Sequence, residues 1–397
     1  MLLSLSVIIL SSLVMSSIFS KLRLPRIIGI LMTGIIIGPF MLDLIAPEIM
    51  STSPDLRQVA LIVILLRAGL SLDLKDLKKV GKPAILLSFI PATLEMLGIT
   101  ILAPLFFDIT YLEAAIMGSI VAAVSPAVVV PRMIELIKRH QGTKHQVPQL
   151  ILAGASLDDI FVIVLFMSFL QAERSGSFEI VQLLLIPVSI LLGAFIGLIS
   201  GLILVYVFKK WHMRDTIKVL MMFSTAFLCV TIEQITQNMI SISGMIAVIM
   251  MGITILKYHD VLAKRLTGKF EKIWVIAEIM LFVLVGAALN PTVVYEKGFR
   301  AIILILIVLW VRMIGVWIAL MPSQLNRSEK IYVAFSYLPK ATVQAAIGAI
   351  PLSLGIPGGE IILSVAVTSI FITAPLGAIL MDRTANKLLS EPSSLPF

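Results

Sequence analysis

Thirteen apolar runs, each about as long as a helix that crosses a lipid bilayer, occupy most of the 397-residue chain. Charged residues make up only 14% of the sequence, whereas a soluble domain carries about 25%. The sequence therefore predicts an all-α polytopic membrane protein. The runs are approximately Leu2–Ser20, Leu24–Ile45, Leu56–Leu72, Pro83–Phe106, Tyr111–Pro131, Gln149–Leu170, Ile180–Phe208, Val219–Ile235, Ile240–Leu256, Ile273–Leu289, Phe299–Met321, Ile331–Leu354 and Glu360–Met381.

The basic residues of the loops fall almost entirely on one side of the membrane if successive runs alternate in direction. That side holds 24 of the 31 lysines and arginines, and the opposite loops hold four. By the positive-inside rule the basic side is cytoplasmic, so the amino terminus is predicted outside and the carboxyl terminus inside. We expect a bacterial inner (plasma) membrane, a first run that is retained as a span, and no long soluble extension. Basic charge spread over many short loops excludes nucleic acid as a partner.

The thirteen runs divide into two sets of six, with opposite topology, around a linking run. We predict a single transmembrane unit over 1–397, with a first repeat at 1–171, a linking helix at 172–215 and a second repeat at 216–397. Prolines interrupt the fifth run at Ser125-Pro126 and the twelfth run at Pro339-Lys340. Matching broken helices in two inverted halves are typical of a transporter's substrate site. Either proline alone is also explained by a plain kink.

Two adjacent carboxylates, Asp158 and Asp159, lie near the middle of the sixth run, which holds no basic residue. A charge at the bilayer centre costs roughly 2.5–3.5 kcal/mol, so the pair indicates function rather than packing. Burial and a neighbouring carboxylate both favour the protonated form of such a group. A carboxyl group that titrates near neutral pH is able to exchange a proton for a monovalent cation. We therefore predict that Asp159 and Asp158 bind Na+ or Li+.

Hard monovalent cations need further oxygen ligands, and three hydroxyl groups are placed to provide them. Ser156 lies three residues before Asp159, on the same helical face. Ser125 and Thr342 lie beside the two predicted breaks, where freed backbone carbonyls would add more oxygens. The hydroxyls of Ser156 and Thr342 are equally able to bond to their own helices.

The remaining charges at membrane depth are expected to pair with one another. Glu95 and Arg312 form the natural couple, either within the ion site or as a structural link between the halves. Lys340 is expected to offset the carboxyl end of a half-helix or to pair with Asp158. The four histidines fall in basic loops, where we expect them to be solvated, although a histidine there is able to tune a pH response.

Four segments carry a recognisable pattern: LRAGLSLDLKDLKK (66–79), VAAVSPAVVVPRM (121–133), GASLDDI (154–160) and LPKATVQAAIG (338–348). They resemble the monovalent cation/proton antiporter superfamily, and most closely its branch of NHA-type sodium/hydrogen antiporters of animals and their bacterial relatives. The resemblance implies crossed broken helices at the fifth and twelfth runs, and a core domain that moves as an elevator against a dimerisation domain in a homodimer.

The same resemblance assigns roles to individual residues. It implies that Asp159 is the main ligand of the cation and the proton and that Asp158 supports it. It places the family's glutamate–arginine pair at Glu95 and Arg312, and the basic residue of the second broken helix at Lys340. The sequence departs from the family at Glu278, where a polar residue without charge is expected, and it lacks the long hydrophilic amino-terminal region of the animal proteins.

We expect secondary active exchange of Na+ or Li+ for H+, without a cofactor and with the bilayer, cations and protons as partners. Exchange is expected to be electroneutral because the arginine at 312 cannot release a proton, although Lys340 is able to titrate. Two alternatives stay open: a K+/H+ antiporter or channel-like leak of the same fold, and a solute symporter or membrane sensor. No nucleotide loop, metal-ligand cluster or nucleophile arrangement occurs, so an enzyme is not expected.

Overall fold

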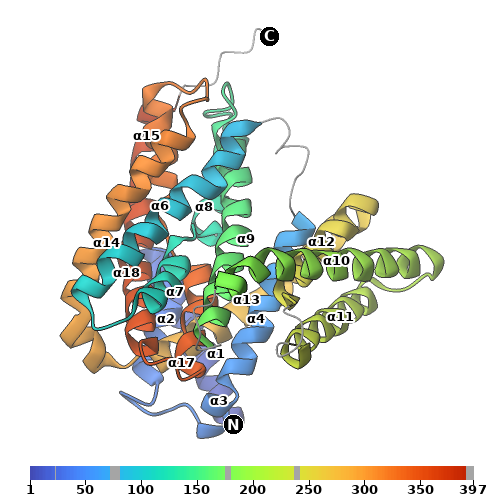
Figure 1. Ribbon diagram of the computed structural model, residues 1–397, viewed down its shortest axis with the longest axis horizontal. Coiled ribbons are helices and arrows are strands. Elements are labelled where there is room, and N and C mark those ends of the chain that lie inside the picture. Colours follow the sequence, from blue (N-terminus) through green and yellow to red (C-terminus); the bar gives the residue numbers. More distant parts are fainter. Residues whose placement is uncertain (23, 72–80, 175–179, 237–241, 390–397) are drawn as a thin grey trace. The chain divides into compact units, whose positions relative to one another are not determined.

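The computed structural model describes residues 1–22, 24–71, 81–174, 180–236 and 242–389, and these residues form helices joined by turns and loops, with no strand among them (Figure 1). The prediction of an all-α protein is confirmed. The motif at 66–79 lies mostly outside the described residues, and so does the side chain of Ser156.

The helices follow the predicted apolar runs in order along the chain. They are α1 (Leu2–Lys21), α2 (Arg26–Ile37), α3 (Pro47–Ser51), α4 (Ser53–Ser71), α6 (Lys82–Phe106), α7 (Tyr111–Ala122), α8 (Pro126–Lys138), α9 (Val147–Arg174), α10 (Ile180–Lys210), α11 (Asp215–Thr236), α12 (Gly244–Tyr258), α13 (Asp260–Ala288), α14 (Pro291–Ala319), α15 (Arg327–Ser336), α16 (Thr342–Gly348), α17 (Ile350–Ser353) and α18 (Gly359–Leu388).

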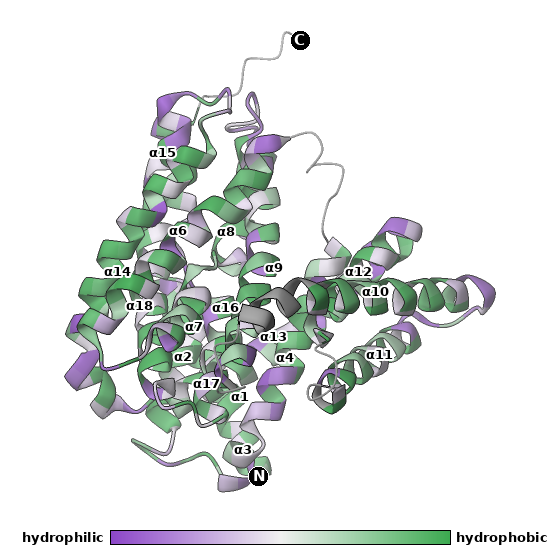
Figure 2. Ribbon diagram, viewed as in Figure 1, coloured by the Kyte–Doolittle hydropathy of each residue, from purple (hydrophilic) through white to green (hydrophobic). Residues whose placement is uncertain are grey.

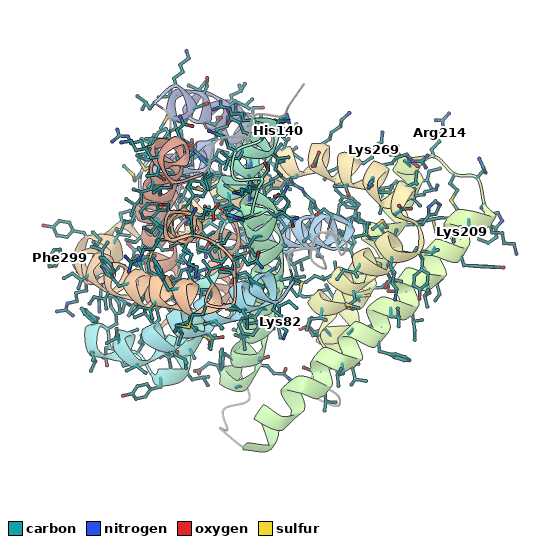
Figure 3. The ribbon with its side chains drawn as sticks, turned by 90° about the horizontal axis from the view of Figure 1, so that it is seen from above. Lys82, His140, Lys209, Arg214, Lys269 and Phe299 are labelled. Atoms are coloured by element: carbon teal, nitrogen blue, oxygen red, sulfur yellow. The ribbon has the colours of Figure 1, made fainter. Side chains whose placement is uncertain are left out.

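The surface of these helices suits a lipid environment. Within the described residues, eight helices are long and apolar enough to cross a membrane, and three shorter apolar segments accompany them. Apolar residues cover the helices, and polar residues gather toward many of their ends (Figure 2). Phe299 on α14 points away from the protein and is 73% exposed, as expected for a side chain that faces lipid (Figure 3).

Several helices are longer than the apolar runs from which they were predicted. Helix α13 begins at Asp260, well before the predicted start at Ile273, and α8 continues to Lys138, past the predicted end at Pro131. Hydropathy marks the part of a helix inside the lipid, whereas backbone hydrogen bonding continues through charged turns outside it. Helix α2 is instead shorter than predicted, because Gly38 and Pro39 end it at Ile37.

The chain divides into two compact units. Unit 1 contains Met1–Pro54, Asp73–Phe166 and Leu281–Phe397, and unit 2 contains Asp55–Leu72 and Met167–Met280. Each unit draws segments from both predicted repeats. Unit 1 includes both broken helices and every charged residue that the sequence places at the ion site.

Unit 2 is built on a close approach between α10 and α12. Gly193, Gly197 and Gly201 recur every four residues along one side of α10, and a Cβ atom at Gly197 would lie 2.3 Å from the carbonyl oxygen of Ala247. Small residues at this spacing let two membrane helices pack backbone to backbone. At the end of α10 and beyond it, Lys209 and Arg214 point outward (Figure 3), and Lys209 complements the negative end of the α10 dipole.

We expect Gly197→Ala to lower the stability of the protein by about 1–3 kcal/mol, because the new methyl group would overlap backbone atoms of α12. Gly268→Ala on α13 is the matched control, since no atom of the described residues lies within 4 Å of its Cβ position. The control is expected to leave stability unchanged or to raise it by up to about 1 kcal/mol through helix propensity. Thermal melting in detergent measures both variants. Equal melting temperatures for the two variants would contradict this account of the packing.

Candidate functional site

The first broken helix is interrupted where proline removes a backbone donor. Pro126 begins α8, and in a continuous helix its missing N–H would have bonded to the carbonyl of Ala122, the last residue of α7. Ala123 and Ser125 are extended, with φ/ψ of −69°/143° and −88°/109°. The break that the sequence predicted is therefore present, and it exposes polar backbone groups in the interior of unit 1.

The second broken helix is interrupted at Pro339, between α15 and α16, and its non-helical segment meets the first. The Ser125 N–H donates to the Pro339 carbonyl oxygen at 2.8 Å. The N–H of Lys340 donates to Oγ1 of Thr373 on α18 at 2.9 Å. Irregular backbone at membrane depth is tolerated only where it is buried in protein or lines a water-filled cavity. These bonds provide the protein partners that the two breaks need.

Side chains from the second half of the chain replace the helical bonds that α7 loses at its end. Nε2 of Gln344 donates to the carbonyl oxygens of Ile120, Val121 and Ala123 at 3.0, 3.3 and 2.9 Å. The carbonyl of Ala122 accepts from Nη1 of Arg312 and from Nζ of Lys340, the latter at 3.4 Å. The carboxyl end of α7 is thereby capped by one amide and two cations.

Four buried charged side chains meet beside this capped end. Oε2 of Glu95 accepts from Nη1 of Arg312 and from Nζ of Lys340, the latter at 2.7 Å. Nη2 of Arg312 lies 3.5 Å from Oδ2 of Asp158. Glu95, Arg312, Lys340 and Asp158 are each 0% exposed. We call these four residues the charge cluster; two are acidic and two are basic, so it is formally neutral.

The two aspartates have different surroundings although they are adjacent. Oδ2 of Asp158 accepts from the Val124 N–H at 2.7 Å, which ties α9 to the first break. Asp159 points about 100° further around α9, away from the direction of Asp158. It is 7% exposed, and its Oδ1 is buried without a hydrogen-bond partner among the described residues. Asp159 is thus a buried carboxyl group that does not belong to the formally neutral charge cluster.

The other predicted ligands lie at or near the breaks. Ser125 is fully buried, and its Oγ has no hydrogen-bond partner within the described part of the chain. Thr342 is the first residue of α16 and is 5% exposed. The Ser156 side chain lies outside the described residues, so its role as a ligand stays a prediction. Glu278 lies on α13 in unit 2.

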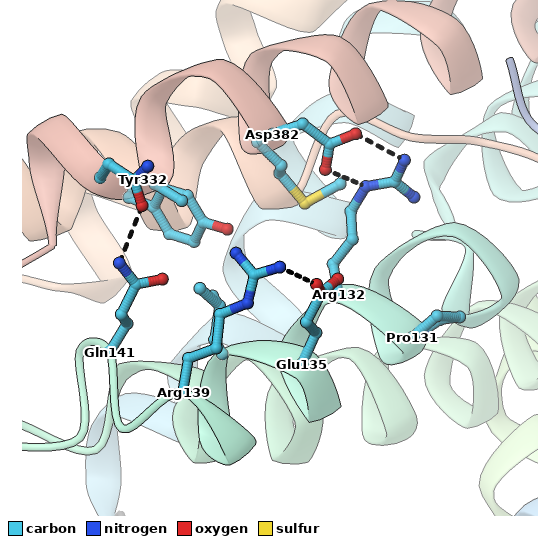
Figure 4. A pocket seen from close by; sticks show the side chains of 11 residues that line it. Pro131, Arg132, Glu135, Arg139, Gln141, Tyr332 and Asp382 are labelled. Carbon is cyan, nitrogen blue, oxygen red and sulfur yellow. Dashed lines mark hydrogen bonds and ion pairs between the residues drawn. The ribbon is translucent and has the colours of Figure 1, made fainter. Parts of the chain in front are cut away.

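A second polar region lies at the basic ends of α8, α15 and α18. It is a cavity of about 410 Å³ lined by Arg132, Glu135, Arg139, Tyr332 and Asp382, among others (Figure 4). Arg132 donates to both carboxylate oxygens of Asp382 at 2.7 and 3.0 Å, and Arg139 pairs with Glu135. The two carboxylates of this cavity, Glu135 and Asp382, are already paired with arginines. The cavity is therefore a weaker candidate for a cation site than Asp159.

Comparison with known proteins agrees with this arrangement. The family described as "Sodium/hydrogen exchanger, transmembrane" matches residues 7–386. The chain belongs to the sodium/hydrogen exchanger family. The human sodium/hydrogen exchanger 9B2 is 30% identical over 392 residues, which cover 93% of this chain and 70% of the human protein. The human sodium/hydrogen exchanger 9B1 is 28% identical, over 94% of this chain and 74% of its own length.

The fold of the protein is similar to that of a protein with solved structures. The sodium proton antiporter MjNhaP1 of Methanocaldococcus jannaschii superposes with a TM-score of 0.82 at 22% sequence identity, over 97% of each chain. A second structure of the same antiporter gives a TM-score of 0.72. The resemblance that the sequence motifs suggested is therefore confirmed. The chain is an integral membrane protein of a family whose named members are transporters.

Three residues of the exchanger's site were not anticipated from its sequence. The carbonyl of Tyr337 accepts from Nε of Arg312 at 2.7 Å, and the tyrosine ring lies 5.5 Å from the guanidinium. Gln344 and Thr373 satisfy backbone groups at the breaks. Gln344 is one of three polar residues inside the motif LPKATVQAAIG, with Lys340 and Thr342, so its position was a signal. The sequence held no such signal for Tyr337 or Thr373, because their contacts depend on the folded structure.

Proposed function

We propose that the protein exchanges Na+ or Li+ for H+ by secondary active antiport, with Asp159 carrying either the cation or the proton. The named relatives are sodium/hydrogen exchangers, and the solved neighbour is a sodium proton antiporter. The observation that carries the assignment to Asp159 is its position outside the neutral charge cluster, in which Glu95 and Asp158 are each paired with a cation. Asp158, Ser125, Ser156 and Thr342 are the proposed supporting oxygens.

The charge cluster supports electroneutral exchange. Arginine does not release its proton at physiological pH, so Arg312 stays charged beside Glu95 and Asp158. The Lys340 ammonium group is bonded to Glu95 at 2.7 Å. With these charges constant, replacing the proton on Asp159 by one monovalent cation leaves the charge of the site unchanged. One cation then moves for one proton in each cycle.

The distribution of the site over the chain supports an elevator mechanism. The charge cluster, both breaks and Asp159 all belong to unit 1. We propose that unit 1 is the moving core domain, that unit 2 is the dimerisation domain, and that the protein is a homodimer. The loop charges support a cytoplasmic basic side, with the amino terminus outside. The relatives named above are human and archaeal, so the bacterial inner membrane is proposed from the sequence alone.

The test is cation-driven proton movement in proteoliposomes that contain the full-length protein and a pH-sensitive dye. A proton gradient is set, and Na+, Li+ or K+ is then added outside, both without a membrane potential and with one imposed. We expect Na+ and Li+ to dissipate the gradient, K+ to have no effect, and the rate to be the same at both potentials. Vesicles without protein provide the background.

Each alternative gives a different result in this assay. Activity with K+ alone would identify a K+/H+ antiporter. A rate that follows the imposed potential would contradict electroneutral exchange, and it would point to Lys340 as a second proton carrier. The absence of coupled proton movement with all three cations would contradict antiport itself.

A further inference from the structure

Both broken helices begin with a glutamate that caps their first turn. At α7 the Glu113 N–H donates to Oγ1 of Thr110, and Oε2 of Glu113 accepts from the Thr110 N–H at 2.8 Å. At α15 Glu329 and Asn326 exchange the same two bonds, at 2.8 and 2.9 Å. Glu113 is 4% exposed and Glu329 is 0% exposed. Full burial is unusual for a capping carboxylate, so each needs a further partner.

Each glutamate finds that partner at the start of another long helix. Oε1 of Glu113 accepts from the N–H of Gly358, the residue before α18, at 2.7 Å. The two carboxylate oxygens of Glu329 lie 2.8 and 2.9 Å from Nδ1 of His145, two residues before α9. Helix α18 follows the second broken helix, and α9 follows the first. The start of each broken helix is therefore tied to the helix that follows the other one.

The two ties differ in their chemistry. The backbone amide of Gly358 does not titrate, whereas a histidine changes its charge between about pH 5 and pH 8. The expectation of a solvated loop histidine is wrong for His145, whose side chain is 29% exposed and contacts a buried carboxylate. We propose that Glu113 and Glu329 are positioning residues of the two broken helices, and that His145 makes the tie at Glu329 sensitive to protons.

The charged groups around this contact are mostly basic. The α8–α9 loop meets α18 through a hydrogen bond of 2.8 Å between Gln141 and Asn386. Near this contact, the charged or titratable residues of these elements are Arg132, Glu135, Lys138, Arg139, His140 and Lys144 on α8 and its loop, Arg327, Lys330 and Tyr332 on α15, and Asp382, Arg383 and Lys387 at the end of α18. Glu135 and Asp382 are paired with arginines. Glu329 is the acidic group that contacts the imidazole.

Protonation of His145 turns this contact into an ion pair with a buried carboxylate. A neutral imidazole is able to donate one hydrogen bond to this carboxylate, and an imidazolium adds the attraction between opposite charges, so the contact is stronger when the histidine carries its second proton. The tie links α15, which leads to Lys340, with the start of α9, which carries Asp158 and Asp159. This role in transport rests on the proposed antiport, in which His145 would set the pH dependence of cation binding.

Hydrogen–deuterium exchange tests the tie without any need for transport. Amide exchange of residues 326–333 is compared at about pH 6 and pH 8, after correction for the intrinsic rates, in wild type, His145→Gln and His212→Gln. In wild type we expect exchange to be about fivefold slower at the lower pH. His145→Gln should lose this difference, whereas His212→Gln, a change at an exposed loop histidine in unit 2, should keep it. Residues 358–363 report the tie at Glu113 and should show no such difference.

A difference that persists in His145→Gln, or that is absent from wild type, would overturn the proposal. The pH profile of exchange in proteoliposomes is the second readout. There the pH of half-maximal exchange should move in His145→Gln and stay constant in His212→Gln. If wild type exchanges no cation but shows the expected amide protection, the antiport proposal fails while the proton-sensitive tie stands. If His145→Gln exchanges cations with the same pH profile as wild type, His145 does not control transport.

Discussion

Asp159→Asn is expected to abolish cation-driven proton movement and, at the same time, to make the protein more stable. An amide has no titratable proton to exchange and no negative charge to balance a cation, so transport should fall to the level of vesicles without protein. The wild-type carboxyl group is 7% exposed and lies outside the charge cluster. A neutral amide avoids the cost of burying an ionised carboxylate, which is larger than the cost of burying an uncharged polar group. Proteoliposome assays and thermal melting measure the two effects.

The opposite directions of these effects separate a functional group from a structural one. Asp43→Asn, in an exposed loop of unit 1, is the matched control and should change neither property. A variant at 159 that loses both transport and stability would show that the carboxylate holds the fold together. Full transport by that variant would contradict the proposed site.

Arg312→Met is expected to destabilise the protein by about 3–5 kcal/mol, the largest stability effect of any single change considered. The substitution leaves Glu95 and Asp158 buried with only Lys340 to balance them, and it removes donors from the carbonyls of Ala122 and Tyr337. The loss comes mainly from the unpaired buried charge, since buried ion pairs by themselves contribute little net stability. The apparent melting temperature in detergent measures it.

A second substitution at Glu95 tests this explanation. In Glu95→Gln/Arg312→Met, the charges that remain in the cluster are those of Lys340 and Asp158, which balance each other. We therefore expect the double variant to be more stable than Arg312→Met alone, with non-additive effects as for groups in direct contact. Arg300→Met, at an exposed position on the same helix, is the control and should have little effect. A double variant that is less stable than either single one would mean that the cluster acts through geometry rather than charge balance.

Local chemistry explains which features could be predicted from the sequence. Pro126 and Pro339 each lack a backbone donor, which predicted a break or a kink at each position, and the structure has a break at both. A proline does not by itself decide between the two, since Pro91 lies inside the continuous helix α6. The pairing of Glu95 with Arg312 followed from the cost of leaving either charge alone at membrane depth. For Lys340 the sequence left two partners open. The structure shows it bonded to Glu95 and beside the last carbonyl of α7, in agreement with the half-helix alternative.

Contacts between distant residues explain what could not be predicted. The capping pattern of Thr110 with Glu113, and of Asn326 with Glu329, is visible in the sequence as a four-residue motif. The second partners of the two glutamates are not visible in the sequence, because they are distant along the chain. His145 and Glu329 are 184 residues apart, and Glu113 and Gly358 are 245 residues apart. Similarly, Gln344 was readable as a polar residue in an apolar segment, but its three carbonyl partners belong to the other half of the chain.

The capping of α7 by residues of the second half bears on how the protein is made. Ala122 and Arg312 are 190 residues apart, and Gln344 follows later still. At about 5–20 residues per second, a ribosome takes about 10–40 seconds to add the intervening segment. During that interval the end of α7 must find other partners for its carbonyls, such as water, lipid headgroups or the insertion machinery. This capping of α7 is therefore a late step of biogenesis, because it has to wait until residues 312 and 344 have been synthesised.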